Sequence, residues 1–254
     1  MRPNLGFLRR PFAVLGGLGI LTGQSLRQAI RRPLGGRLIL AEMYNLGVTS
    51  LSITNVTLLF TGMVICIQTS YTLGAYGAKI YVGNMVGLSV ALELGPVLTA
   101  LMIAGRVGAG ITADIGSMNV SEQIDALRAL AADPVKKLVV PRLIALLVMV
   151  PALTLLAILI GIFGGLIMAV LDIGQTSEFY LAHVQHSLTV KDLLRGLGKA
   201  PFFAFAIGII ACYNGLNATG GADGVGRATR NTVVTASLVI FVSNFFLAKL
   251  FLWL

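Results

Sequence analysis

The sequence predicts an all-α integral membrane protein with about five transmembrane helices. Of its 254 residues, 56% are hydrophobic and only 11% are charged, and the mean hydropathy is +0.89. A soluble domain carries about 25% charged residues, so this composition excludes both a soluble globular protein and a disordered chain. The net charge of +9 does not indicate nucleic-acid binding, because basic residues collect beside the cytoplasmic face of a membrane.

Five apolar stretches are each near or above the ~20 residues that cross a hydrocarbon core of ~30 Å. The second contains Glu93 as its only deep acidic residue, the fifth contains only Lys249, and the others are free of charge over most of their length. We expect spans at about residues 46–73, 82–110, 138–171, 196–214 and 231–253, within one membrane domain of residues 43–254.

Basic residues are divided unevenly between the two sets of loops. Seven arginines lie in the N-terminal arm, five basic residues lie in segment 106–142, and Arg227 and Arg230 follow the fourth span. The loops on the other side contribute five basic residues against these fourteen. Because cytoplasmic loops are enriched in Lys and Arg, we expect a cytoplasmic N-terminus and, with an odd number of spans, a C-terminus on the outer side.

The N-terminal arm, residues 1–42, resembles a signal peptide at first, since Arg9 and Arg10 precede an apolar run. No small-x-small cleavage site follows that run. Leucines flanked by arginines instead predict a basic helix that lies in the headgroup layer. The alternative is a disordered basic leader, because Pro11 and several glycines interrupt the segment.

Small residues recur every four positions in the second and third spans. In lipid, such residues let helix backbones approach closely, so we expect both stripes to be packing surfaces. Glu93 lies deep in the second span, where a carboxylate is costly and is a functional candidate by default. Its structural alternative is pairing with Lys199 or capping of a broken helix. Pro96 predicts a local bend beside this carboxylate.

A short amphipathic helix is predicted over residues 119–132, between the second and third spans. Asn119 is placed to cap it with Glu122 at the third position, and Asp133-Pro134 ends it. One stripe of the helix is apolar and consists of Val120, Ile124, Leu127 and Ala131. Such a helix either lies on the membrane or fits a groove on another protein.

The chain lacks the motifs of catalysis and of nucleotide binding. The glycine-rich run 220–227 follows no predicted strand and contains no lysine, so we expect a tight cytoplasmic turn that presents Arg227 and Arg230. A Walker A motif and a serine elbow are both missing. His183 and His186 lack further firm ligands for a metal. We therefore expect no catalytic residue, metal or cofactor, and any ATP-driven work belongs to another chain.

Several blocks of sequence, in fixed order, resemble the MlaE/YrbE family of ABC transporter permeases. They are ELGPV at 93–97, AGRVGA at 104–109, EQIDAL at 122–127, Asp133-Pro134, Pro141-Arg142 and GGADGVGRAT at 220–229 followed by Val233-Val234. The resemblance covers nearly the whole chain after about residue 40. It identifies residues 43–254 as an MlaE-type permease domain of an MCE-associated phospholipid transport system.

The resemblance implies a multi-subunit transporter in the inner membrane. Two permease copies would pair, cytosolic ABC ATPases that bind ATP and Mg would dock beneath them, and a periplasmic MCE-domain protein would sit on the outer side, with a STAS-domain subunit in some members. The helix of residues 119–132 is similar to the family's coupling helix, which inserts into the ATPase groove. The residues assigned to that contact are Glu122, Ile124, Asp125, Leu127 and Arg128.

The resemblance also implies a lipid pocket between the two copies, lined by the end of the first span and the start of the second. On matching positions the lipid-binding residues are Ile65, Gln68, Thr72, Leu73, Tyr76 and Glu93, with Lys199 near the outer end of the fourth span. Apolar members suit acyl chains and polar members suit a headgroup. Leu92 stands where some members carry arginine, a departure that bears on lipid preference.

Two other classes of function compete with a lipid-transporting permease subunit. A proton-coupled secondary transporter would use Glu93, but the odd number of spans, the lack of an evident inverted repeat and the single central carboxylate disfavour it. A membrane-embedded lipid enzyme would need a nucleophile and a base at a recognisable spacing, and the sequence offers none.

Overall fold

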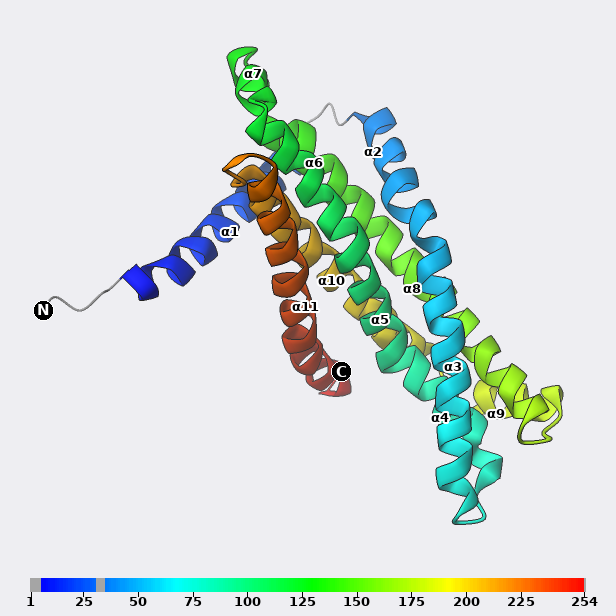
Figure 1. Ribbon diagram of the computed structural model, residues 1–254. Coiled ribbons are helices and arrows are strands. Elements are labelled where there is room, and N and C mark those ends of the chain that lie inside the picture. The colour runs from blue at the N-terminus through cyan, green and yellow to red at the C-terminus, as the bar shows by residue number, and fades with distance from the viewer. Residues whose placement is uncertain (1–5, 31–34, 254) are drawn as a thin grey trace, which may run out of the picture.

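The computed structural model describes residues 6–30 and 35–253, and these ranges form an elongated bundle of helices without a strand (Figure 1). Five helical runs are long and apolar enough to cross a membrane. They are Gly36–Gly74, Lys79–Val120, Val135–Leu171, Val190–Leu216 and Gly221–Phe251. The predicted all-α membrane fold with five spans is therefore confirmed.

Three of the five runs contain changes of helical pitch, whereas the fourth and fifth are single helices. The first run is α2 (Gly36–Glu42), η1 (Met43–Gly47), η2 (Val48–Ser50) and α3 (Leu51–Gly74); the second is η3 (Lys79–Tyr81), α4 (Val82–Ser89), η4 (Val90–Leu94), α5 (Gly95–Ile103), η5 (Ala104–Gly108) and α6 (Ala109–Val120); the third is η6 (Val135–Val139) and α8 (Val140–Leu171); the fourth is α10 (Val190–Leu216) and the fifth α11 (Gly221–Trp253). The boundary expected after residue 42, between the N-terminal arm and the membrane domain, falls inside the first of these runs.

Two short helices mark opposite ends of the bundle. Helix α7 (Gln123–Ala129) projects from the end where α2 and α11 begin, and α9 (Ser177–Ser187) lies at the other end beside the start of α4 (Figure 1). The N-terminal arm, segment 106–142 and the arginines after the fourth span, as far as the structure describes them, therefore all extend to the end that carries α7. We call the end with α7 the α7 end and the other the α9 end.

Close helix packing relies on the small residues that the sequence repeats. A Cβ on Gly62 of α3 would collide with the backbone carbonyl of Gly161 in α8, and one on Gly164 would collide with that of Leu59. The stripe along the second run is buried throughout: Ala100, Ala104, Gly108, Thr112 and Gly116. The prediction that both stripes are packing surfaces is confirmed, since only residues without bulky side chains permit this approach.

Helix α1 (Gly6–Ile30) runs through Pro11 without a break, so the alternative of a disordered leader is wrong for these residues. The N-terminal part of α1 diverges from the bundle (Figure 1). The C-terminal part of α1 packs against the bundle through buried Leu21 and Ser25. Near its end, Gln28 Nε2 donates to Asp133 Oδ2 at 2.6 Å. The placement of α1 in the headgroup layer stays a prediction.

The short helix after α6 is smaller than the predicted 119–132. Helix α6 continues to Val120, and α7 begins only at Gln123 after Glu122, which has a left-handed backbone with φ 59°. Asn119 does not cap α7, because its Nδ2 donates to the carbonyl of Ala218 at 3.0 Å. The capping prediction was wrong because this amide joins α6 to the loop after α10 instead.

The glycine-rich run is mostly helix rather than the expected turn. Gly220 and Gly221 have positive φ angles of 90° and 67°, and α11 begins at Gly221. The turn after α10 is thus confined to the few residues before α11. Arg227 and Arg230 consequently project from the first turns of α11, where both are exposed, and the expected loop at these two arginines was wrong.

Candidate functional site

A charged cluster inside the bundle centres on Glu93, which lies in the wide helical turn η4. This turn directly precedes Gly95 and Pro96, so the helix changes its pitch beside the proline, while the bend expected there stays a prediction. The ammonium of Lys199, from α10, donates to Glu93 Oε1 at 2.6 Å and to the carbonyl of Leu92 at 2.9 Å. Asn244 Nδ2, from α11, donates to Glu93 Oε2 at 2.9 Å. Both carboxylate oxygens are therefore engaged.

The two charges of this cluster differ in their exposure. The side chain of Lys199 is 2% exposed, whereas that of Glu93 is 45% exposed. A ligand at the bundle surface can therefore touch the carboxylate, but it reaches the ammonium only if Glu93 moves. Lys199 compensates the charge of Glu93 and fixes its orientation, as expected for ionisable groups within a membrane protein.

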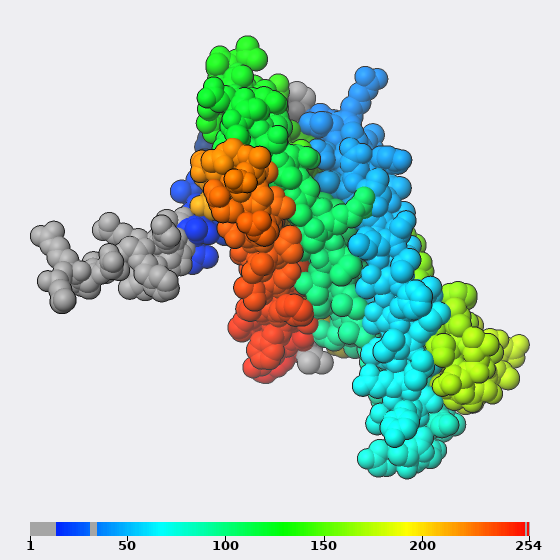
Figure 2. Space-filling model, viewed as in Figure 1, coloured from blue at the N-terminus to red at the C-terminus, as the bar shows by residue number. Residues whose placement is uncertain are grey.

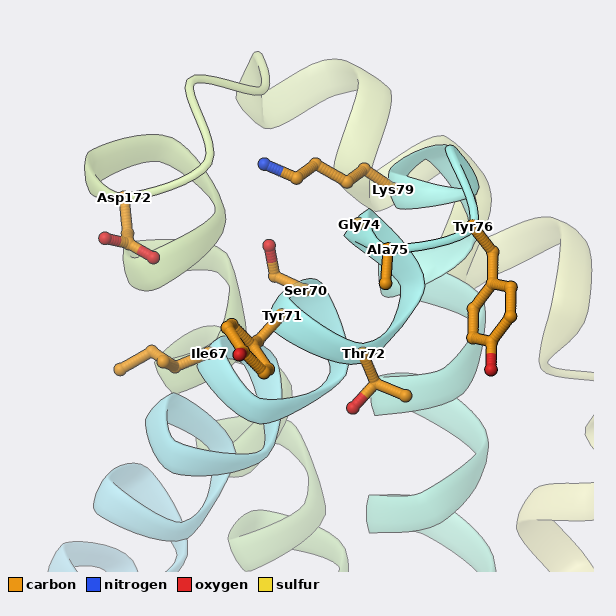
Figure 3. Close-up of a pocket in the computed structure, with 9 residues that line it drawn as sticks. All are labelled: Ile67, Ser70, Tyr71, Thr72, Gly74, Ala75, Tyr76, Lys79 and Asp172. Carbon is orange, nitrogen blue, oxygen red and sulfur yellow. The ribbon is translucent and has the colours of Figure 1, made fainter.

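A second polar site is a pocket of about 680 Å³ at the α9 end of α3. Figure 3 shows the side chains that line it, on the last turns of α3 and at the loops that follow α3 and α8. The Lys79 side chain extends over Ser70 toward the side where Asp172 lies. Tyr71 and Tyr76 are 86% and 82% exposed, so they form the open edge of the pocket.

The lipid-binding set expected from the sequence divides between several places. Thr72 and Tyr76 line the pocket. Ile65 and Leu73 are half-buried and pack into the bundle against a cluster that includes Cys66, Val82 and Val86. Gln68 is exposed on α3 outside the pocket. Within the described residues, no hydrogen bond or ion pair joins these α3 residues to Glu93 or Lys199.

Sequence reasoning missed five polar residues of these two sites: Ser70, Tyr71, Lys79 and Asp172 in the pocket, and Asn244 beside Glu93. Lys79 and Asp172 are the charges that bound the first and third apolar stretches on one side of the membrane. Their position on the same side of the membrane was the feature of the sequence that could have indicated a shared site. No such feature marked Asn244, because the sequence does not indicate which group a single amide in an apolar helix will contact once the helices pack.

The α7 end presents a different surface. Of the expected apolar stripe, Ile124 is fully buried and Leu127 is half-buried against the chain itself, whereas Val120 and Ala131 are exposed. Leu130, just beyond α7, is 79% exposed. Asp125 and Arg128 form an exposed ion pair of 2.7 Å. The tip available to another protein is thus mainly charged, with Leu130 as its large apolar side chain.

A five-span helical bundle with a compensated carboxylate inside it and a polar pocket at one end defines a membrane protein of the transporter class. The sequence model of the family described as Permease MlaE matches residues 39–250. The chain belongs to this family of ABC transporter permeases.

Individual relatives agree with the family match. The chain is 43% identical over 230 residues to a probable ABC transporter permease protein of Synechocystis sp., covering 91% of this chain and 88% of that one. It is 40% identical over 237 residues to a probable ABC transporter permease protein of Rickettsia felis, covering 93% and 92%. It is also 40% identical over 214 residues to the intermembrane phospholipid transport system permease protein MlaE of Haemophilus influenzae, covering 84% and 82%.

Proposed function

We propose that this ABC transporter permease subunit moves phospholipid, or a related lipid, between the inner membrane and a periplasmic MCE-domain partner. The observation that carries the proposal is the 40% identity to the phospholipid transport permease of Haemophilus influenzae, which extends over 84% of this chain. The polar groups of the bundle suit an amphiphile. Glu93 offers a reachable carboxylate in an apolar wall, and the pocket at the α9 end combines Lys79, Asp172 and two tyrosines.

ATP would be hydrolysed by a separate cytosolic ATPase that contacts the α7 end. Helix α7 is short, but Gln28 of α1 binds Asp133 just beyond it, and α6 leads from it directly into the bundle. A push on α7 would therefore reach both α1 and the second span. The subunit itself makes and breaks no bond, ATP and Mg belong to the ATPase, and a STAS-domain subunit would accompany the ATPase in some systems.

The orientation proposed for this function places the α7 end in the cytoplasm and the α9 end in the periplasm. The α7 end carries more basic residues than the α9 end, and an excess of Lys and Arg favours the cytoplasmic side. The pocket with Lys79 and Asp172 then opens toward the periplasmic MCE partner, and a second copy of the chain would complete the cavity between two bundles.

The rival function, proton coupling through Glu93, gains no support from the comparisons with known proteins. Glu93 also accepts hydrogen bonds from Lys199 and Asn244, so both of its carboxylate oxygens are already engaged by neighbouring helices. We therefore retain lipid movement as the function and regard Glu93 as a group that contacts lipid.

The proposal is tested by purifying the chain together with its co-expressed neighbours and identifying retained lipid by mass spectrometry. We expect phospholipid at near-stoichiometric amounts and an ATPase in the same complex. A Glu93→Gln variant should retain less lipid, whereas Glu178→Gln, a change in α9 outside both sites, should not. Retention of no lipid by a folded complex that contains the ATPase would overturn the proposal.

A further inference from the structure

A third polar cavity lies at the α7 end, apart from both sites described above. Its volume is about 430 Å³, and it is formed where α2 and η1 meet η5, α6 and the start of α8. Four charged side chains line it: Glu42, Arg106, Asp114 and Arg142. In Figure 2 the green surface of the second run is visible between the orange and red surface of α11 and the blue surface of the first run.

Arg142 is a buried cation whose hydrogen bonds are incomplete. The residue is 8% exposed. Its Nε lies 3.3 Å from Glu42 Oε1 and one terminal nitrogen lies 3.8 Å from Asp114 Oδ2. The other terminal nitrogen donates to the Leu138 carbonyl at 3.5 Å, the limit for a hydrogen bond.

Within the described ranges, Arg142 Nε makes no hydrogen bond of acceptable geometry. A buried guanidinium needs acceptors for its five N–H groups, because an unsatisfied buried charge is costly. Arg142 is therefore charge-paired with Glu42, while its Nε–H has no well-aligned acceptor among the described residues.

Arg106 supplies a second guanidinium to the same cavity. One of its terminal nitrogens donates to Ser50 Oγ at 2.9 Å, which holds the side chain beside the first span while the residue stays exposed. Two guanidinium groups can bind a phosphate by paired hydrogen bonds. The cavity thus offers phosphate donors from two helical runs, with one of the two guanidinium groups already desolvated.

The two carboxylates decide which phosphate compound fits. Glu42 and Asp114 balance the two arginines, so a simple anion would lie against two like charges. A ligand that carries both a phosphate and an ammonium group instead offers a negative charge to the arginines and a positive charge to a carboxylate. Asp114, with a side chain that is 68% exposed, is the carboxylate that an incoming ammonium group reaches more readily than Glu42, which is 17% exposed.

The helical run that contributes Glu42 to the cavity also exposes apolar side chains, along which acyl chains would lie. Leu38, Leu40, Tyr44 and Val48, on α2 and the two irregular turns after it, are 44%, 67%, 61% and 43% exposed. We infer that this cavity binds the headgroup of a zwitterionic aminophospholipid, with phosphate on Arg106 and Arg142 and ammonium on Asp114. The inference rests on the proposed function for its lipid class, and it adds a site at the α7 end.

The test measures lipid binding by the intact complex, without ATP. The complex is placed in nanodiscs of phosphatidylcholine with a trace of phosphatidylethanolamine that carries a photoreactive group beside its phosphate, and the labelled peptides are identified. We expect crosslinks to α2 and α6. Arg106→Gln should reduce them about tenfold, because one charge-assisted contact is lost. Arg195→Gln is the matched control, since that arginine pairs with Asp192 near the α9 end.

A second variant separates headgroup recognition from folding. Asp114→Asn keeps the shape of an exposed side chain, so the complex should assemble normally. We expect this variant to lose the preference for phosphatidylethanolamine over phosphatidylglycerol, because the partner of the ammonium group is gone. Arg106→Lys should retain part of the crosslinking, since it keeps the charge and loses the paired geometry.

The outcomes distinguish this inference from the proposed function. Unchanged crosslinking in both Arg106→Gln and Asp114→Asn would overturn the inference, even if ATP-driven lipid transfer is intact. Displacement of the probe by phosphoethanolamine at a concentration no higher than that of the probe lipid would also overturn it, because the acyl chains would then contribute nothing to binding. Wild-type complex that crosslinks as expected but transfers no lipid with ATP would contradict the proposed function and leave the binding site supported.

Discussion

The ammonium of Lys199 lies 2.6 Å from Glu93 Oε1, yet the side chain of Lys199 is 2% exposed and that of Glu93 is 45% exposed. This pair joins α10 to the irregular turn of the second span, and Asn244 attaches α11 to the same carboxylate. Three of the five spans therefore meet at one half-exposed anion. Because the two side chains differ in burial, removing Glu93 leaves a buried charge, whereas removing Lys199 leaves a half-exposed one.

Glu93→Gln should destabilise the protein more than Lys199→Met does. The first change leaves a buried ammonium without its counter-charge, which costs about 3 kcal/mol or more, whereas the second leaves a carboxylate that water or lipid headgroups can reach. Thermal unfolding in detergent would measure the order. The double variant should regain much of the stability lost by Glu93→Gln, and equal midpoints for both single variants would contradict the described burial.

Gly62→Ala should weaken the contact between α3 and α8 by about 1–3 kcal/mol, because its Cβ would press on the backbone carbonyl of Gly161. Gly226→Ala is the matched control, since no atom lies within 4 Å of its added Cβ and alanine favours helix. The two variants are compared by their unfolding midpoints in one detergent. A Gly62→Ala protein as stable as the wild type would show that the two helices pack less closely than described.

Thr232→Val should cost about 1 kcal/mol, because the Thr232 hydroxyl joins three helices. It lies 2.9 Å from Thr112 Oγ1 on α6 and accepts from Asn214 Nδ2 on α10 at 2.9 Å. Thr229→Val provides the control, since that hydroxyl donates to the Val225 carbonyl of its own helix and, within the described ranges, joins no second helix. Unfolding midpoints and protease resistance of the α7 end would measure the difference, and equal effects would argue against the network.

Leu130→Asp should reduce co-purification of the ATPase at least tenfold while leaving the unfolding midpoint unchanged, because this side chain is 79% exposed at the α7 end. Ile124→Asp should instead lower the midpoint, since Ile124 is fully buried in the chain's own core. Val190→Asp, at an exposed position of the α9 end, is the control for charge alone. Normal ATPase binding by Leu130→Asp would exclude this tip as the docking point.

The spans could be predicted because lipid imposes long apolar stretches, and each stretch became one helical run. The close packing followed from glycine and alanine spacing for the same reason. Helix ends were less predictable. Asn119 has the sequence context of an N-cap, but its amide bonds to Ala218, which is distant in sequence and became a neighbour only through packing of α6 on α10.

Glu93 could be predicted as a site residue because a carboxylate inside a membrane span costs free energy whatever its neighbours are. Its partner Asn244 and the buried state of Ile124 could not be predicted, because both depend on which faces of the helices meet. Polar residues that bound apolar stretches, such as Lys79 and Asp172, gather in space only when two spans end at the same level. Pattern within one helix does not contain that information.

The central claim, that this permease moves lipid only when a separate ATPase subunit works on it, is tested most directly by reconstitution. Proteoliposomes that contain the purified chain with its co-expressed partners and a fluorescent phospholipid are assayed for lipid transfer to an acceptor. We predict transfer that requires ATP and the ATPase and that falls strongly in the Glu93→Gln variant. Transfer at the same rate by the chain alone, without ATP or the ATPase, would contradict the account.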